Sequence, residues 1–270
     1  MSVIALASGK SCGVTVSALA LALSSPRPSL LVEADPAGGT IRVGYLQGEG
    51  SAQVGLHRLA AAERQGPHAL ATEFRRHWVA LDQEHSGKRM LLPGLTDPAQ
   101  APSMARTWDA IAELIAVMDG HGYDVIIDAG RIVAQSETRL STTVYPAPLL
   151  RAADVVLLTV RSTQASVLAT RPAVRVLREE LAQHGTGADA LGLLIVEEGS
   201  LSSSNIQQWL QTPAYAALEW DPDTADVLTH GAFKKSGRGL LRSARTAHDR
   251  IHEIVTRRRI QLARPAPVQG

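Results

Sequence analysis

Short apolar runs alternate with longer segments of helical period along most of this chain. The runs end in turn residues, and the segments between them have the spacing of amphipathic helices. This alternation is typical of βαβ units, so the predicted class is α/β: a mostly parallel central sheet flanked by helices in three layers. Strands are predicted at residues 2–7, 29–32, 90–92, 124–128, 154–160, 191–196 and 216–220. Helices are predicted at residues 15–24, 56–64, 104–118, 164–183, 203–210 and 240–262.

The strongest strand signal is the run Asp-Val-Ile-Ile-Asp at residues 124–128. Its three middle residues are apolar on both faces, which predicts a central strand covered by helices on both sides. No repeat, low-complexity tract or linker divides the chain. We therefore predict a single domain over residues 1–262, followed by a disordered tail at residues 263–270, where two prolines occur.

Composition narrows the class of protein further. The 270 residues are 45% hydrophobic, and their net charge of +1 provides no overall attraction to nucleic acid or anionic lipid. The single cysteine, Cys12, excludes an internal disulfide and a cysteine-based zinc site, and it suits a reducing compartment. The apolar stretch at residues 18–23 is too short for a signal peptide or a membrane span. These features predict a soluble, cytoplasmic protein.

A loop of small residues follows the first predicted strand and precedes the first predicted helix. It runs Ser-Gly-Lys-Ser-Cys-Gly-Val-Thr from residue 8 to residue 15, against the P-loop pattern G-x-x-x-x-G-K-[ST]. In a P-loop, backbone N–H groups surround phosphates, the lysine reaches the outer phosphates, and the hydroxyl binds magnesium. Gly13 and Thr15 match the pattern, whereas Ser8 replaces the first glycine and Val14 replaces the lysine. The loop alone therefore fits an ordinary strand-to-helix turn equally well.

Two aspartates follow other strands of the predicted sheet. Asp35 comes after the second strand, and Asp128 ends the central one. In an open parallel sheet, ligands bind outside the carboxyl ends of the strands, so Gly13, Thr15, Asp35 and Asp128 are expected at one edge. Each aspartate taken alone is equally compatible with a turn or a helix cap. Their order along the chain, however, favours a nucleotide site.

These segments together resemble the MinD/ParA/CpaE group of deviant P-loop ATPases, which act in division-site placement, DNA partition and pilus positioning. The resemblance covers most of the chain and indicates a degenerate, TadZ-like member. The similar segments are residues 3–20 (strand and K-G-G-x-G-K-T-T loop), 30–39 (D-x-D-P-x-G switch), 123–130 (Y-D-x-x-x-x-D Walker B), 153–160 (the following strand) and 218–223 (the I-P-x-D loop on the base side).

The resemblance implies a P-loop NTPase fold and ATP or ADP with Mg²⁺ as the cofactor. It implies that Asp35 and Asp128 are the catalytic carboxylates, and that Thr15, Asp35 and Asp128 form the magnesium site. The residues implied to contact nucleotide are Gly9, Lys10, Ser11, Cys12, Gly13, Val14, Thr15 and Val16, with Asp221 and Pro222 near the adenine.

The two loop lysines of the group fall here at Gly9 and Val14, which carry no charge. Loss of the phosphate-bridging lysine removes charge-assisted hydrogen bonds worth roughly 1.5–3 kcal/mol each. Lys10 and Arg131 are the cations that could replace it, although for Arg131 a pair with a surface carboxylate is the favoured interpretation. We therefore expect nucleotide binding with weak or no hydrolysis, and the sequence leaves open whether the chain is an enzyme.

The resemblance implies a positioning or assembly factor that acts as a homodimer. Two alternatives remain open. One is a nucleotide-independent scaffold, or pseudo-ATPase, that recruits pilus, secretion or cell-division partners. The other is a slow ATPase that acts in DNA partition.

Three further features have competing interpretations. The last predicted helix, residues 240–262, is amphipathic and ends in Arg257, Arg258 and Arg259. It could bind the inner membrane surface or DNA, or pack on the sheet with arginines near its carboxyl end. His248 and His252 have metal-like spacing but no carboxylate pair to complete a site, so exposed positions are expected. The serines at residues 202–204 are expected to cap a helix.

Overall fold

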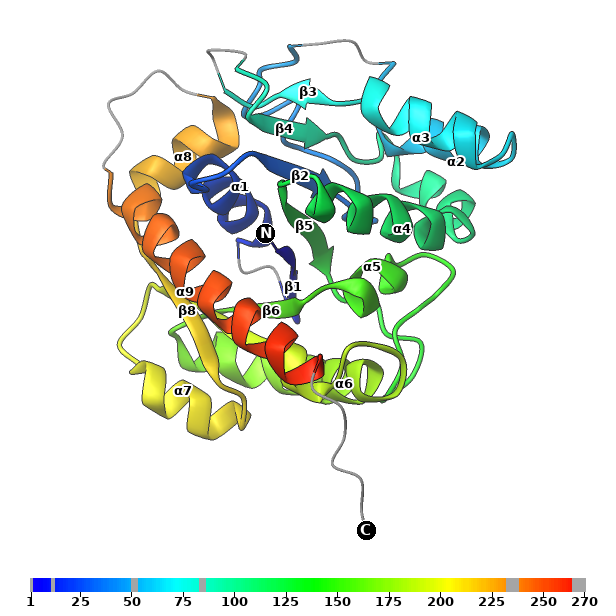
Figure 1. The fold of residues 1–270 in the computed structure, drawn as a ribbon. Coiled ribbons are helices and arrows are strands. Elements are labelled where there is room, and N and C mark those ends of the chain that lie inside the picture. The colour runs from blue at the N-terminus through cyan, green and yellow to red at the C-terminus, as the bar shows by residue number, and fades with distance from the viewer. Residues whose placement is uncertain (1, 11–12, 50–52, 83–85, 232–237, 264–270) are drawn as a thin grey trace.

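The computed structural model describes residues 2–10, 13–49, 53–82, 86–231 and 238–263, and within them the strands form one eight-stranded sheet (Figure 1). The strand order is β3-β4-β2-β5-β1-β6-β7-β8. Every neighbouring pair of these strands is parallel except β3 with β4, which confirms the predicted α/β class. The strands are β1 (Val3–Ser8), β2 (Ser29–Glu33), β3 (Val79–Ala80), β4 (Arg89–Leu92), β5 (Asp124–Arg131), β6 (Val155–Arg161), β7 (Leu191–Glu197) and β8 (Ala214–Glu219).

Helices cover both faces of the sheet and form two apolar clusters with it. One cluster joins the sheet to α2 through α7, and the other joins it to α1, α8 and α9. The α-helices are α1 (Val14–Ser24), α2 (Leu56–Glu63), α3 (Pro67–Arg76), α4 (Thr107–Gly120), α5 (Ala147–Ala152), α6 (Gln164–His184), α7 (Ser203–Leu210), α8 (Pro222–His230) and α9 (Gly239–Leu262). Two 3₁₀ helices, η1 (Pro98–Met104) and η2 (Ala188–Ala190), complete the described elements.

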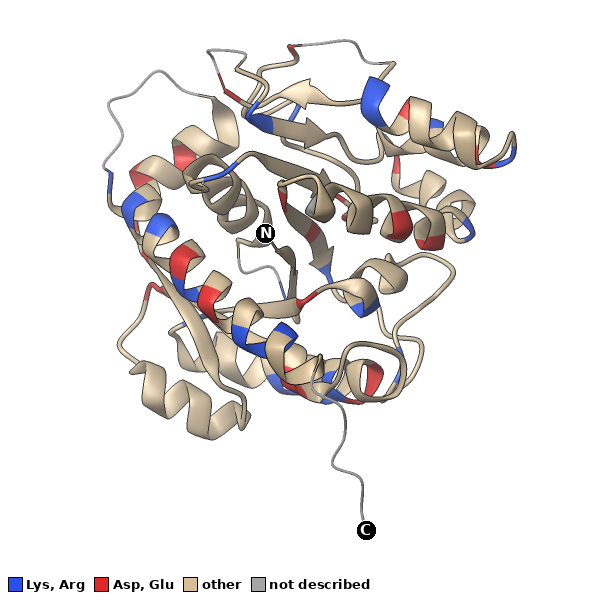
Figure 2. Cartoon of the chain, viewed as in Figure 1, with Lys and Arg blue, Asp and Glu red and all other residues tan. Residues whose placement is uncertain are grey.

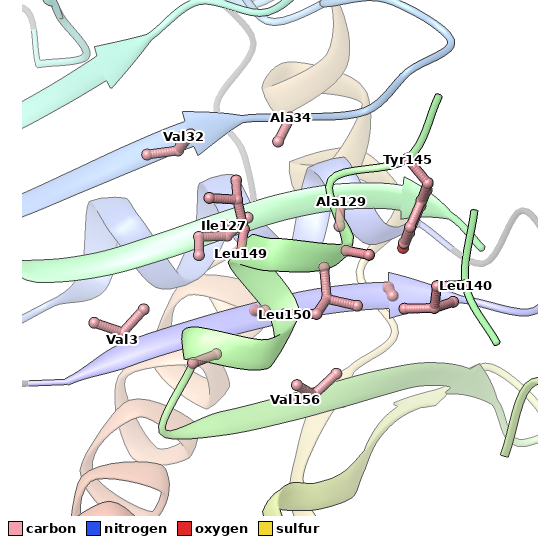
Figure 3. Close-up of a cluster of buried hydrophobic side chains, with 14 of the residues drawn as sticks. Val3, Val32, Ala34, Ile127, Ala129, Leu140, Tyr145, Leu149, Leu150 and Val156 are labelled. Atoms are coloured by element: carbon pink, nitrogen blue, oxygen red, sulfur yellow. The ribbon is translucent and has the colours of Figure 1, made fainter. Parts of the chain in front are cut away.

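The central position predicted for residues 124–128 is confirmed, because β5 lies between β2 and β1. Alternate residues of neighbouring strands point to the same side, so Val32, Ile127 and Val156 lie toward α5, which contributes Leu149 and Leu150 (Figure 3). All five of these side chains are buried. This packing leaves the carboxyl ends of β1, β2 and β5 side by side at one edge.

The opposite face is covered by α1, which is itself covered by α9. Its sequence, VTVSALALALS, alternates small and large apolar residues and is buried over most of its length. A helix that is apolar all round is stable only between two layers, and here those layers are the sheet and α9 (Figure 1). The first turn of α1 is therefore held firmly above the end of β1.

Several elements differ from the prediction. The helices α3, α5 and α8 and the short strand β3 were not predicted, and β5 continues to Arg131 instead of ending before Ala129. The extension is possible because Gly130 takes a φ of +61° while the register with β1 shifts, so that Ser8 pairs with Arg131. Of the predicted tail, Ala263 is the C-cap of α9, and residues 264–270 lie outside the described part.

Candidate functional site

The carboxyl ends of three adjacent strands bring the predicted site residues together. Glu33 on β2 and Asp128 on β5 are register partners, and the backbone N–H of Ala34 donates to the carbonyl of Asp128 at 2.7 Å. Thr15 lies in the first turn of α1, which follows β1. The predicted convergence of Thr15, Asp35 and Asp128 at this edge agrees with the fold.

Asp128 is fully buried at the centre of this edge. Its Oδ1 accepts the N–H of Gly130 at 3.0 Å, whereas Oδ2 has no partner with hydrogen-bond geometry among the described residues. Burial raises the pKa of Asp128 to about 7; the nearby Thr15 hydroxyl and the N–H of Gly130 oppose the shift, and the charges of Glu33 and Asp35 reinforce it. A buried carboxylate oxygen without a donor is suited to a cation or to a proton.

Asp35 lies beside it and depends on a glycine. Its carboxylate accepts the N–H of Ala37 at 2.8 Å, and burial raises its pKa. A Cβ at position 130 would lie 2.1 Å from Asp35 Cγ, so any side chain there would force the Asp35 carboxylate to move. The φ of +61° at Gly130 requires glycine for a second, independent reason.

Glu33 belongs to the same cluster, and the sequence analysis did not identify it. It is 1% exposed, and its carboxylate accepts the N–H groups of Thr40 at 2.6 Å and of Ile41 and Gly94 at 2.9 Å. Burial raises its pKa, and these three backbone bonds oppose the increase. Glu33 thus ties the loop after β2 to the segment after β4. A carboxylate at the end of an otherwise apolar strand was the signal that could have revealed it.

The two positions that hold lysines in the resembled group are occupied differently here. Val14 is 5% exposed and packs in the apolar cluster of α1 and α9. Gly9 faces α6, where an added Cβ would lie 3.1 Å from the carbonyl oxygen of Ala169 and from Ala173 Cβ. Position 14 is therefore part of the core, and position 9 is part of a helix contact.

The other predicted loop residues are exposed, half-buried or outside the described part. Lys10 is exposed, Val16 is half-buried against the α1–α9 cluster, and Ser11 and Cys12 lie outside the described residues. Arg131 is exposed at the end of β5, and no carboxylate of the described part forms an ion pair with it. The alternative in which Arg131 pairs with a surface carboxylate thus has no counterpart among those residues.

Asp221 and Pro222 have a structural role in α8. Asp221 is the N-cap: Oδ1 accepts the N–H of Thr224 at 3.0 Å, and Oδ2 accepts the N–H of Leu240 at 3.3 Å. Pro222 begins the helix, where its missing N–H costs nothing. Next to them Trp220 is 40% exposed, and the guanidinium of Arg161 lies 5.4 Å from its ring centroid.

The basic end of α9 is largely committed to internal ion pairs, although Figure 2 shows several cations along this helix. Arg258 is 5% exposed and lies 3.1 Å from Asp189, and Arg259 lies 2.5 Å from Asp154. The interpretation in which α9 packs on the sheet agrees with these contacts, and Arg258 is not available to a membrane or DNA.

The exposed position expected for His248 is wrong. This side chain is 1% exposed, and its Nε2 lies 3.1 Å from Asp124 Oδ2, which also accepts Arg27 Nε at 3.0 Å. His252 is half-buried and lies 3.1 Å from Arg27. The expected cap at residues 202–204 is confirmed, because Ser202 Oγ accepts the N–H of Asn205 at 3.2 Å.

Within the described ranges, no three His, Cys, Asp or Glu side chains are grouped so as to hold a metal ion. Magnesium, however, is usually bound by one or two carboxylates together with water and substrate phosphates. The hydroxyl of Thr15 and the carboxylates of Asp35 and Asp128 are oxygen donors of that type.

Among the described helices, none is long and apolar enough to span a bilayer.

Comparisons with known proteins identify solved structures with a similar fold. Neither the protein-family models nor the curated proteins gave a match. Among solved structures, the chain is similar to the septum site-determining protein MinD of Pyrococcus horikoshii OT3, complexed with Mg-ADP, with a TM-score of 0.64 and 16% identity over 94% of this chain and 97% of that one. A ParA family ATPase from Chlorobium tepidum TLS has the same TM-score and 15% identity, covering 92% of this chain and 98% of that one.

A third similar structure is cobyrinic acid a,c-diamide synthase from Mycobacterium smegmatis with bound ADP and magnesium, with a TM-score of 0.60, 18% identity and coverage of 100% and 99%. The chain therefore has the P-loop NTPase fold of these proteins. Since one of them is named as a synthase and two as division or ParA-type proteins, the fold by itself does not select among their activities.

Proposed function

We propose that this chain is a MinD/ParA-like positioning or assembly factor whose degenerate site binds ATP or ADP with Mg²⁺ and hydrolyses it slowly or not at all. The observation that carries the proposal is a combination. Thr15, Asp35 and Asp128 are gathered at the carboxyl edge of the sheet, while Val14 is buried in the core where the group has its lysine. The side chains that could bind magnesium are thus retained, whereas the lysine that bridges phosphates is absent.

The retained residues fit magnesium and phosphate. Among the described residues, no side chain caps the amino end of α1 and its first turn has no acidic residue, so its N–H groups remain for a phosphate. Asp128 Oδ2, which is buried without a partner, would gain one from the metal or its water shell. Bound magnesium would offset part of the negative charge of the phosphates and of Glu33, Asp35 and Asp128. Asp35 would orient the water on the outer phosphate.

The absence of the phosphate-bridging lysine limits both nucleotide affinity and the rate of hydrolysis at this site. A single charge-assisted donor contributes roughly 1.5–3 kcal/mol to binding, and removal of one transition-state donor slows reactions by about 10²–10³. Val14 has no donor, and the half-buried Gly9 has no side chain to reach across to a second subunit. We therefore propose that nucleotide serves as a weakly held ligand that stabilises the assembled state.

The proposed assembly is a homodimer that recruits protein partners of a pilus, secretion or division machinery. Two similar structures are named as a septum site-determining protein and as a ParA family ATPase, which supports a positioning function in general. The internal pairing of Arg258 and Arg259 argues against DNA or membrane as the main cargo of α9. Light scattering with and without ATP measures the mass directly, and a monomer under both conditions would contradict the dimer.

The experiment that tests the nucleotide site is a titration with a fluorescent ATP analogue, with and without Mg²⁺. We expect micromolar, magnesium-dependent binding that weakens at least about tenfold in Thr15→Ala and in Asp128→Ala. Asp109→Ala is the matched control, because this exposed carboxylate lies on α4, away from the site. No binding at millimolar nucleotide would overturn the proposal and leave the nucleotide-independent scaffold.

A second variant tests the role of position 14. Val14→Lys buries a charge in the α1–α9 cluster and is expected to lower stability. Where the variant stays folded by circular dichroism, we expect nucleotide binding to tighten by about tenfold or more through a new charge-assisted contact, whereas Val14→Leu, which keeps the position apolar, should not tighten it. The hydrolysis rate is measured in parallel. If it stays at background in Val14→Lys, the missing lysine is not what limits turnover.

A further inference from the structure

A cavity of about 460 Å³ lies between α2 and α3, and it shares no residue with the nucleotide loop or with the carboxylate cluster. Its lining carries Arg58 from α2 and Glu73, Arg76 and His77 from the end of α3, with the amide of Gln65 at its rim. Sites for small molecules commonly have volumes in this range and a few convergent polar groups.

The charges of this lining favour an anion. Arg58 and Arg76 contribute two guanidinium groups, of which Arg58 also donates from Nη2 to Gln53 Oε1, and Glu73 is the only carboxylate among the described lining residues. Glu73 is already engaged, because Oε2 lies 3.1 Å from His77 Nε2 and Oε1 accepts Arg76 Nη1 at 3.3 Å. With His77 neutral the lining carries one net positive charge, and protonation of His77 adds a second.

His77 supplies the unsatisfied group. It is 6% exposed, it lines the cavity, and neither of its ring nitrogens has a partner with hydrogen-bond geometry among the described residues, although Nε2 lies 3.1 Å from Glu73. Burial lowers the pKa of His77; Glu73 opposes the shift, and Arg58 and Arg76 reinforce it. Burial also lowers the pKa of His57, and the charge of Arg58 adds to this effect. An anion in the cavity would stabilise protonated His77, whose Nδ1–H could then donate to it.

We propose that the α2–α3 cavity is a binding site for a small oxyanion, either a phosphate or sulfate ester or a carboxylate, held by Arg58, Arg76 and His77. The fork of a guanidinium matches two oxygens of either group. Binding tightens as the pH falls, because the ligand and the His77 proton stabilise each other. The site is independent of the nucleotide site proposed above.

Isothermal titration calorimetry of the full chain with sulfate and with malonate tests this site and separates tetrahedral from carboxylate ligands. We expect saturable binding of at least one probe, stronger at about pH 6 than at about pH 8. Sulfate has the same charge at both values, so its pH dependence reports the protein. Arg58→Gln and His77→Gln are each expected to weaken binding at least about tenfold.

Arg64→Gln is the matched control, because Arg64 is exposed at the end of α2 and does not line the cavity. Its affinity should equal that of the original chain. Absence of saturable binding, or equal weakening in Arg64→Gln, would overturn the proposal, the latter by showing general charge attraction only. If His77→Gln fails to fold, Arg58→Gln decides the outcome, since Arg58 is exposed. Nucleotide titration of the same variants should be unchanged.

Discussion

Three carboxylates at the sheet edge lie in surroundings that disfavour their charged form. Glu33, Asp35 and Asp128 all have a pKa raised mainly by burial, and within the described residues no lysine side chain is buried beside them. A P-loop with its lysine would offset part of this charge. Here the offset must come from protons, or from the magnesium proposed above.

The pKa of Asp128 predicts how stability depends on pH. Its value of about 7 lies above the ordinary 3.8, so between these values the folded state binds the extra proton. The free energy of unfolding should then fall as the pH rises, by about 1.4 kcal/mol per pH unit for this one group, and level off above about pH 7. In Asp128→Asn, urea unfolding should show a smaller fall and greater stability than the original chain at about pH 8. The exposed Asp109→Asn should change neither, and an unchanged slope in Asp128→Asn would refute the assignment.

Gly130 offers a test of the contact with Asp35. Gly130→Ala places a methyl group within 2.1 Å of the carboxylate carbon, on a backbone with a φ of +61°. Gly87 has a similar φ of +71° and no atom within 4 Å of an added Cβ, so Gly87→Ala measures the backbone penalty alone. We expect a penalty of about 1–2 kcal/mol at Gly87 and a clearly larger one at Gly130. Equal losses in urea unfolding would mean that the Asp35 contact is unimportant.

At the scale of the elements, the sheet is anchored at its amino edge by ionic contacts to α9. Asp124, at the start of β5, is fully buried and accepts Arg27 Nη2 at 2.8 Å, Ser25 Oγ at 3.0 Å and Ser2 Oγ at 3.2 Å. His248 Nε2 of α9 lies 3.1 Å from Asp124 Oδ2, the oxygen that Ser25 also contacts. Burial would raise the pKa of Asp124, but the hydrogen bonds and charges of His248 and Arg27 outweigh it and hold that pKa well below its usual range.

This anchor should be strongly stabilising. Asp124→Asn removes the counter-charge of Arg27 from a buried carboxylate site, so we expect a loss of about 3–5 kcal/mol at neutral pH in urea unfolding. Because the folded pKa is depressed, the contribution should disappear as the pH falls below about 4, and the difference from the original chain should shrink there. Asp249→Asn, on an exposed position of α9, is the control. A loss below about 1 kcal/mol would show that apolar packing alone holds α9.

Helix α6 shows how an element contact accounts for a residue that the loop motif does not explain. Gly9 departs from the resembled pattern, and the sequence indicated only that charge was missing there. In the fold, the backbone of α6 at Ala169 and Thr170 approaches Gly9 so closely that a side chain would require a shift of a few tenths of an ångström. The glycine is thus explained by helix packing as well as by lost chemistry.

At the scale of the whole molecule, two apolar clusters share one continuous sheet. Residues on one side of each strand belong to the cluster of α4, α5 and α6, and residues on the other side belong to that of α1 and α9. Neither cluster can lose its helices without exposing the strands that support the other. This arrangement favours the single domain predicted over residues 1–262.

The prediction that follows is one cooperative unfolding transition. Trp108 is buried in the α4 cluster, whereas Trp220 follows β8 at the far edge of the sheet, so tryptophan fluorescence reports both ends. Its urea transition should coincide with that of far-ultraviolet circular dichroism. Two separated transitions would show that the chain contains independently stable parts.

The sequence by itself determined the described strands other than β3, although not where β5 ends, because apolar periodicity is a local property that any layered fold must bury. It placed Asp35 after its strand and Asp128 at the end of another, and the fold brought both to one edge, although β5 continues past Asp128. Short elements such as α5 and β3 were missed, since they carry too few residues for a period to be recognised. Only tertiary structure decided which charged side chains are buried.

Glu33, His248 and Arg258 illustrate that last point. Each is polar and would be expected at the surface from its type alone, yet each is buried against partners that lie far away along the chain or on another element. Gly94 binds Glu33, Asp124 binds His248 and Asp189 binds Arg258. The burial of a charge depends on whether the fold supplies its counterpart, and that information is absent from any local stretch of sequence.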